Sequence, residues 1–89
     1  MSKANLRLEC LRPATKWVRP TGDEVREVLG LAGFSASAAA KALGLGDGGG
    51  RTVRRWTGEE TNISFANWAL LCDFAGLGQI WKEGERENI

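Results

Sequence analysis

Residues 35–58 of the chain, SASAAAKALGLGDGGGRTVRRWTG, decide its fold. Ser35 is a candidate helix N-cap, because its side-chain oxygen is able to accept a hydrogen bond from a first-turn amide. The run 36–43 has the highest helix propensity in the chain, and Gly44 ends it. The glycine-rich stretch Gly44–Gly50 then predicts a turn.

A second short helix is predicted over residues 51–57, with Thr52 as its candidate cap. Val53 and Trp56 lie three positions apart and therefore share one face of this helix. Small side chains such as Ala40 allow the preceding helix to lie close to it. Two short helices joined in this way form a helix-turn-helix pattern. The residues left facing outward are Arg51, Thr52, Arg54 and Arg55.

Helical spacing continues on both sides of this motif. Thr21, followed by acids in the first turn, predicts the start of a helix over residues 22–32, and Gly33 predicts its end. Residues 64–75 predict a further helix with one buried stripe. The stripe consists of Phe65, Trp68, Leu71, Cys72 and Ala75. The predicted fold class is therefore all-α.

The first twenty residues lack helical periodicity. Pro13 and Pro20 argue against a long helix there, and the alternation over Leu6–Leu11 indicates a short strand or an extended arm. The sequence thus divides into a basic N-terminal arm at residues 1–20, a helix-turn-helix domain at 21–82 and a C-terminal tail at 83–89.

The length and the residue inventory exclude several classes of protein. Eighty-nine residues allow one small domain. No run is apolar enough to span a membrane and no secretory signal is visible, so a cytoplasmic location is expected. Histidine is absent, and Cys10 and Cys72 are expected to be free thiols. Because no general base, metal-ligand set or paired acids stand out, no enzyme, metal, cofactor or small-molecule ligand is predicted. The glycine-rich turn lacks the Gly-Lys-Ser/Thr sequence of a phosphate-binding loop.

Charge is divided unevenly along the chain, although the formal net charge is only +1. Residues 1–55 carry ten Lys and Arg against five Asp and Glu, whereas residues 56–89 carry two against six. A basic half on a small domain favours a polyanion as the partner.

Two segments carry a resemblance to a known family. Ala40-Lys41-Ala42-Leu43-Gly44-Leu45 and Val53-Arg54-Arg55-Trp56-Thr57-Gly58 resemble the motif of the lambda-repressor/Cro-like (Xre-type) helix-turn-helix family. The likeness covers about residues 25–75, although the turn through Gly46–Gly50 is longer than is usual in that family. It implies a four- to five-helix domain, here with an extended basic N-terminal arm. The implied function is a sequence-specific regulator of transcription that binds double-stranded DNA, most simply a repressor from a bacterium, phage or mobile element.

The resemblance also implies roles for individual residues. In that family the third helix enters the major groove and the second crosses the backbone. Base contacts then fall to Arg54 and Arg55, with Arg51 and Thr52 at the groove edge, and arginine prefers guanine. The candidates for phosphate contacts are Ser35, Ser37 and Lys41. The alternative for each is a solvated helix face.

A dimer is expected, because one short recognition helix reads few bases. It would bind a pseudo-palindromic operator with half-sites about one helical turn apart. The interface candidates are Leu70, Leu71, Leu77, Ile80 and Trp81. Leu6–Leu11 is a second possible contact between subunits, and the basic arm has an alternative place in the minor groove. Trp56 and Trp68 are predicted core residues, whereas Trp17 and Trp81 either staple their segments to the domain or join subunits.

Two further functions remain open from the sequence. One is a small helical protein-interaction adaptor or antitoxin-like subunit, in which the arginine face binds a protein. The other is a non-specific architectural protein, whose DNA affinity would depend steeply on salt without a base preference.

Overall fold

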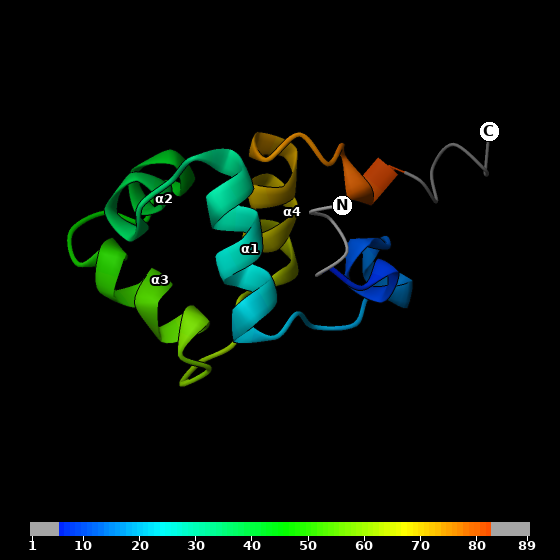
Figure 1. Cartoon of the computed structure of the whole chain (residues 1–89), viewed down its shortest axis with the longest axis horizontal. Coiled ribbons are helices and arrows are strands. Elements are labelled where there is room, and N and C mark those ends of the chain that lie inside the picture. Colours follow the sequence, from blue (N-terminus) through cyan, green and yellow to red (C-terminus); the bar gives the residue numbers. More distant parts are fainter. Residues whose placement is uncertain (1–5, 83–89) are drawn as a thin grey trace.

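The first helix begins at a reciprocal cap. The structure is a computed structural model and describes residues 6–82 (Figure 1). Thr21 Oγ1 accepts the Glu24 N–H at 3.2 Å, and the Glu24 carboxylate accepts the Thr21 N–H at 2.8 Å. This capping box opens helix α1, Gly22–Ala32, which has the predicted bounds. Gly33 ends α1 in the left-handed conformation, with φ of 76°.

Two more helices are capped by serine, the first of them at the predicted cap Ser35 and the second at Ser64, which the prediction placed inside the helix. Ser35 Oγ accepts the Ala38 N–H at 3.1 Å and opens helix α2, Ala36–Leu43. Ser64 Oγ caps helix α4, Phe65–Phe74, in the same manner. The predicted helices at 36–43 and 64–75 are therefore confirmed to within a residue at each end.

Helix α3, Gly49–Thr57, begins earlier than the sequence predicts. Its N-cap is Gly48, so Thr52 lies inside the helix and the turn from α2 ends before Gly49. Packing explains why the first residue of α3 is glycine, because a Cβ at Gly49 would lie 2.7 Å from the Cβ of Ala40. Gly49, which the sequence assigns to the turn, thus allows close packing of α3 against α2.

The helices enclose one apolar core, and residues 6–82 contain no β-strand. Helices α1 and α4 lie side by side, and α2 and α3 pack together at one end of the molecule (Figure 1). Trp56 and Trp68 are buried, as predicted. In the α4 stripe, Trp68, Leu71 and Cys72 are fully buried, and Phe65 and Ala75 are half-buried. Both cysteines are buried free thiols, and burial raises the pKa of Cys10 to about 11 and that of Cys72 to about 12.

The N-terminal segment forms neither a strand nor an arm away from the body over its described part. It consists of two short 3-10 helices, η2 at Leu8–Leu11 and η3 at Ala14–Lys16, and its Leu6 and Cys10 belong to the core. The Cys10 carbonyl accepts indole N–H groups from Trp17 at 3.1 Å and from Trp68 at 2.6 Å. The Trp17 ring also packs edge-to-face against Phe65 of α4, so Trp17 connects this segment to α4.

The C-terminal side ends in a short 3-10 helix, η4, Ile80–Lys82, with Ile80 in the core. Residues 1–5 of the predicted arm and the predicted tail at 83–89 lie outside the described residues. No helix within residues 6–82 combines the length and apolar character needed to cross a membrane.

Candidate nucleic-acid interface

Helix α3 has one apolar and one basic face. Val53 and Trp56 are buried against the core, with exposures of 0% and 6%. Arg51, Arg54 and Arg55 are all exposed on the opposite side of the helix. The core therefore holds α3 through one face and leaves three guanidinium groups in solvent.

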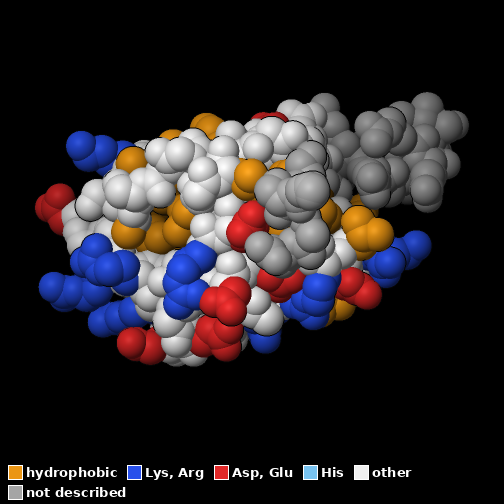
Figure 2. Space-filling view, viewed as in Figure 1, with side chains coloured by type: hydrophobic (Ala, Val, Ile, Leu, Met, Phe, Trp, Pro, Cys, Tyr) orange, Lys and Arg blue, Asp and Glu red, His pale blue; other side chains and the backbone are white. Residues whose placement is uncertain are grey.

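These three arginines form no ion pair with any residue between 6 and 82. Within residues 6–82, the ion pairs are Arg7–Glu24 and Asp23–Arg26, so no described carboxylate neutralises the α3 face. Figure 2 shows Lys and Arg side chains gathered at the end of the molecule that α2 and α3 form. A surface of this kind attracts a polyanion.

Polar residues of α2 adjoin the α3 face. Ser37 and Lys41 are one helical turn apart and are both exposed. A Cβ at Gly50 would lie 3.3 Å from Ser37 Oγ and 3.7 Å from Arg54 Nη1, so both groups approach the same point of α3. Ser37 of α2 and Arg54 of α3, a predicted phosphate contact and a predicted base contact, therefore lie beside each other.

Two predicted contact residues are less available for DNA than the arginines of α3. Ser35 is exposed, but its hydroxyl oxygen already caps α2, which leaves its O–H free as a donor. Thr52 is half-buried beside Val53 and is less accessible than the arginines. The sequence assigns Gly50 to the turn and therefore does not place it beside Ser37 and Arg54. Its position four residues before Arg54, on the same face of a helix, is the signal that could have indicated this.

The C-terminal end of α3 is held by α1. Arg26 Nη2 donates to the Thr57 carbonyl at 3.0 Å, and the Gly22 N–H donates to Glu59 Oε2 at 2.6 Å. Sequence reasoning missed these contacts, since residues more than thirty positions apart carry no local signal for them.

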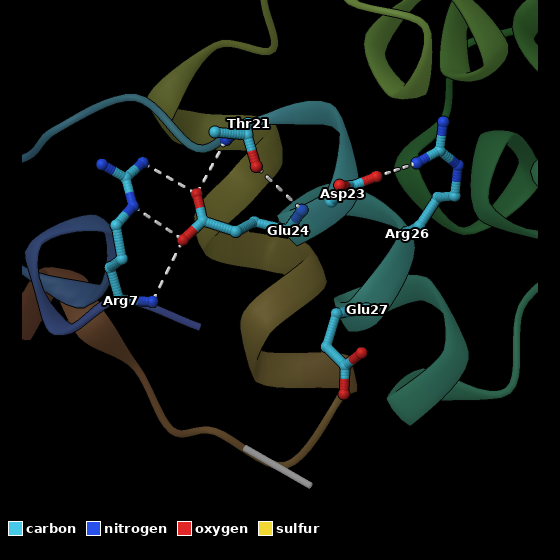
Figure 3. A pocket seen from close by; sticks show the side chains of 6 residues that line it. All are labelled: Arg7, Thr21, Asp23, Glu24, Arg26 and Glu27. Carbon is cyan, nitrogen blue, oxygen red and sulfur yellow. Dashed lines mark hydrogen bonds and ion pairs between the residues drawn. The ribbon is translucent and has the colours of Figure 1, made fainter. Parts of the chain in front are cut away.

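Beside this junction lies a charged hollow of about 620 Å³ (Figure 3). Arg7 Nη2 and Nε donate to the two Glu24 carboxylate oxygens, each at 2.8 Å, and the Arg7 N–H adds a third hydrogen bond at 3.0 Å. Burial opposes ionisation of Glu24, but hydrogen bonds from Arg7 and the Thr21 N–H outweigh it and lower its pKa to about 2. Arg26 pairs with Asp23 on the same wall. Arg7 is therefore a structural residue and not part of a free basic surface.

The basic N-terminal segment lies far from α3. In Figure 1, η2 and η3 are on the other side of α1 and α4, near the opposite end of the longest axis of the molecule. Neither η2 nor η3 extends beside α3; only the end of the segment, Arg19 and Pro20, comes near it, where both line a hollow with Trp56.

The predicted interface residues separate into two groups. Leu71 and Ile80 are buried in the chain's own core, which removes them from the surface. Leu70 is 41% exposed, whereas Leu77 and Trp81 are half-buried. A second, almost wholly apolar hollow of about 290 Å³ is lined by Phe65, Ala66, Ala69, Leu70 and Trp81.

Comparison with known proteins settles the family. A transcriptional repressor protein KorC from Escherichia coli is 66% identical over 80 residues, which cover 90% of this chain and 94% of the relative. A second Escherichia coli protein of the same name is 63% identical over 82 residues, covering 92% and 96%. The chain belongs to the KorC family of transcriptional repressors. No protein-family model and no solved structure matches it.

Membership of the KorC family confirms the predicted repressor and indicates a regulator rather than an enzyme. The all-helical structure is compatible with a small helix-turn-helix domain.

Proposed function

We propose that this KorC-family protein represses transcription by binding double-stranded DNA sequence-specifically through α3, as a lambda-repressor/Cro-like helix-turn-helix domain. The observation that carries the proposal is the set of unpaired arginines on the exposed face of a short helix whose other face is locked in the core. A domain of this size without an effector module represses most simply by occupying DNA that polymerase needs.

In this arrangement α3 enters the major groove. Arg54 and Arg55 reach base edges, with Arg51 and Thr52 near the groove edge. A guanidinium group donates two hydrogen bonds to guanine O6 and N7, so the operator contains G in each half-site. Ser35, Ser37 and Lys41 bind phosphates beside the groove and fix the register of α3.

The functional unit in this proposal is a homodimer. Two copies of α3, related by a two-fold axis, read half-sites about 10 bp apart on a pseudo-palindromic operator. The exposed Leu70 and the half-buried Leu77 and Trp81 supply the apolar contact between subunits.

Arg54→Ala tests the assignment of α3. It should weaken binding to the preferred site by about 1–3 kcal/mol and relax the base preference at one position of each half-site, because a bidentate contact is lost. The measurement is selection from a random DNA duplex pool at about 150 mM salt, near physiological ionic strength, followed by titration of the enriched site.

Arg12→Ala is the matched control, since it removes the same charge from an exposed residue of the distant N-terminal segment. This variant should select the same motif as the unmodified protein. If no motif emerges from the pool and Arg54→Ala binds as weakly as the unmodified protein, the arginine face serves a protein partner instead. Steep salt dependence without any motif would indicate a non-specific architectural protein.

A further inference from the structure

The turn after α3 places a glutamate where the backbone usually takes glycine. Glu59 has φ of 61° and is the one non-glycine residue with positive φ among residues 6–82. Its N–H donates to the Trp56 carbonyl at 3.1 Å, and the Glu60 N–H donates to the Arg55 carbonyl at 2.9 Å. These are the two hydrogen bonds of a Schellman motif, whose left-handed residue is normally glycine. Here the glycine, Gly58, stands one position earlier, with φ of −88°.

The side chain of Glu59 accounts for its presence at this position. Its Oε2 accepts the N–H of Gly22 at 2.6 Å, across 37 positions of sequence. Gly22 is the first residue of α1, so its N–H has no acceptor within the helix, and a carboxylate is favoured at that end of a helix. One carboxylate thereby ties the turn after α3 to the start of α1.

A second hydrogen bond, from a side chain of α1 to the backbone of α3, also joins these two helices. Arg26 of α1 donates to the Thr57 carbonyl at the C-terminal end of α3, where the helix lacks donors of its own. A Cβ at Gly22 would lie 2.2 Å from that carbonyl oxygen, so the two helices meet backbone to backbone. The contact lies two residues beyond Arg55.

We infer that Glu59 is a positioning residue, which fixes the angle of α3 against α1 and thereby the base preference of Arg54 and Arg55. The inference rests on the proposed function, because it assigns a determinant of specificity to the same surface. A bidentate contact to a base requires the guanidinium group at one place and orientation, and a helix free to tilt would lose that contact. A side chain in a disfavoured backbone conformation persists only where the surrounding structure holds it, as the hydrogen bond to Gly22 does here.

Two substitutions of Glu59 separate positioning from simple stability. Glu59→Gly removes the carboxylate but suits the left-handed backbone, so its melting temperature should stay near that of the unmodified protein. Glu59→Gln removes the same charge but keeps a side-chain oxygen as acceptor for the Gly22 N–H. Glu60→Gly is the matched control, because the exposed Glu60 side chain makes no hydrogen bond or ion pair within the described chain.

The measured quantity is the ratio of affinity for the selected DNA site to affinity for a scrambled duplex of equal length. Glu59→Gly should lower this ratio about tenfold, the lower end of the effect of losing one charge-assisted hydrogen bond, while Glu59→Gln and Glu60→Gly keep it within about twofold. In amide NMR, the Gly22 N–H should be protected from exchange in the unmodified protein and in Glu59→Gln, and unprotected in Glu59→Gly.

An unchanged ratio in Glu59→Gly, or an equal loss in Glu59→Gln, would overturn the inference and leave Glu59 as a helix cap alone. The proposed function fails in a different experiment. An unmodified protein that prefers no site over the scrambled duplex would refute sequence-specific binding before any variant is compared.

Discussion

Single glycines set how closely the helices of this protein approach. Gly49 and Gly30 both lie in α-helices, where alanine is intrinsically the better residue by about 1 kcal/mol. Their surroundings differ, because a Cβ at Gly49 would lie 2.7 Å from Ala40 Cβ and 2.8 Å from Leu45 Cβ, whereas a Cβ at Gly30 would meet nothing within 4 Å. The same substitution at the two positions should therefore have opposite effects.

Gly49→Ala is expected to lower the free energy of unfolding by about 1–3 kcal/mol, the usual effect of overpacking a close contact. Gly30→Ala should raise it by up to about 1 kcal/mol. Urea denaturation followed by circular dichroism measures both values. Stabilisation by Gly49→Ala would mean that α2 and α3 are free to move apart, contrary to the contact described.

At the scale of elements, one partly buried ion pair, between the buried Glu24 and the more exposed Arg7, joins the N-terminal segment to α1. The Glu24 side chain is only 5% exposed, and its carboxylate binds Arg7 and the Thr21 N–H. Its pKa of about 2 lies below the 4.5 of an ordinary glutamate. A carboxyl group with a lowered pKa in the folded state stabilises the fold above about pH 4.5, and this contribution is lost as the pH falls toward 2.

Glu24→Gln should lower the free energy of unfolding at pH 7 by about 1–3 kcal/mol, because hydrogen bonds to a charged group are lost. Between pH 5 and about pH 2, its stability should then fall less steeply than that of the unmodified protein. Urea denaturation at a series of pH values measures the two curves. Parallel curves would show that the pair does not contribute to acid sensitivity.

Elements with strong local signals were predictable from the sequence, and those formed by distant contacts were not. The helices at 22–32, 36–43 and 64–75 follow from caps and apolar spacing that lie within each segment. The start of α3 was not predicted correctly, because the glycine at 49 is explained by its tertiary contacts with Ala40 and Leu45 and not by a local signal. The alternation over Leu6–Leu11 indicates a strand, but no partner strand exists within residues 6–82 and the segment packs as a 3-10 turn.

The same distinction holds for the candidate interface. The arginines of α3 could be chosen from the sequence, because buried Val53 and Trp56 determine which face remains outside. Among the predicted subunit contacts, helical spacing already places Leu71 in the buried stripe of residues 64–75, which conflicts with its place among the interface candidates, whereas Leu70 lies outside that stripe. The packing of α4 against α1 buries one and exposes the other.

At the scale of the whole molecule, the proposed dimer uses the apolar surface around Leu70. Leu70→Glu should weaken association of the subunits at least about tenfold, because it places a charge in an apolar contact. It should also weaken binding to the full operator more than binding to a single half-site. Analytical ultracentrifugation and titration with both duplexes measure these effects.

Leu8→Glu is the corresponding control, since Leu8 is 71% exposed and lies on the N-terminal segment. It should leave association unchanged. Dissociation by Leu8→Glu and not by Leu70→Glu would instead assign the subunit contact to the N-terminal segment.

The hydrogen bond from Trp68 to the Cys10 carbonyl has a consequence for the order of folding. It joins residues 58 positions apart, so closing it costs more chain entropy than the local contacts between α2 and α3. Helices α1 to α3 precede α4 along the chain, so Cys10 has no Trp68 to meet until residue 68 has been synthesised. The N-terminal segment therefore acquires this partner in the core only after the sequence of α1 to α3 has been synthesised.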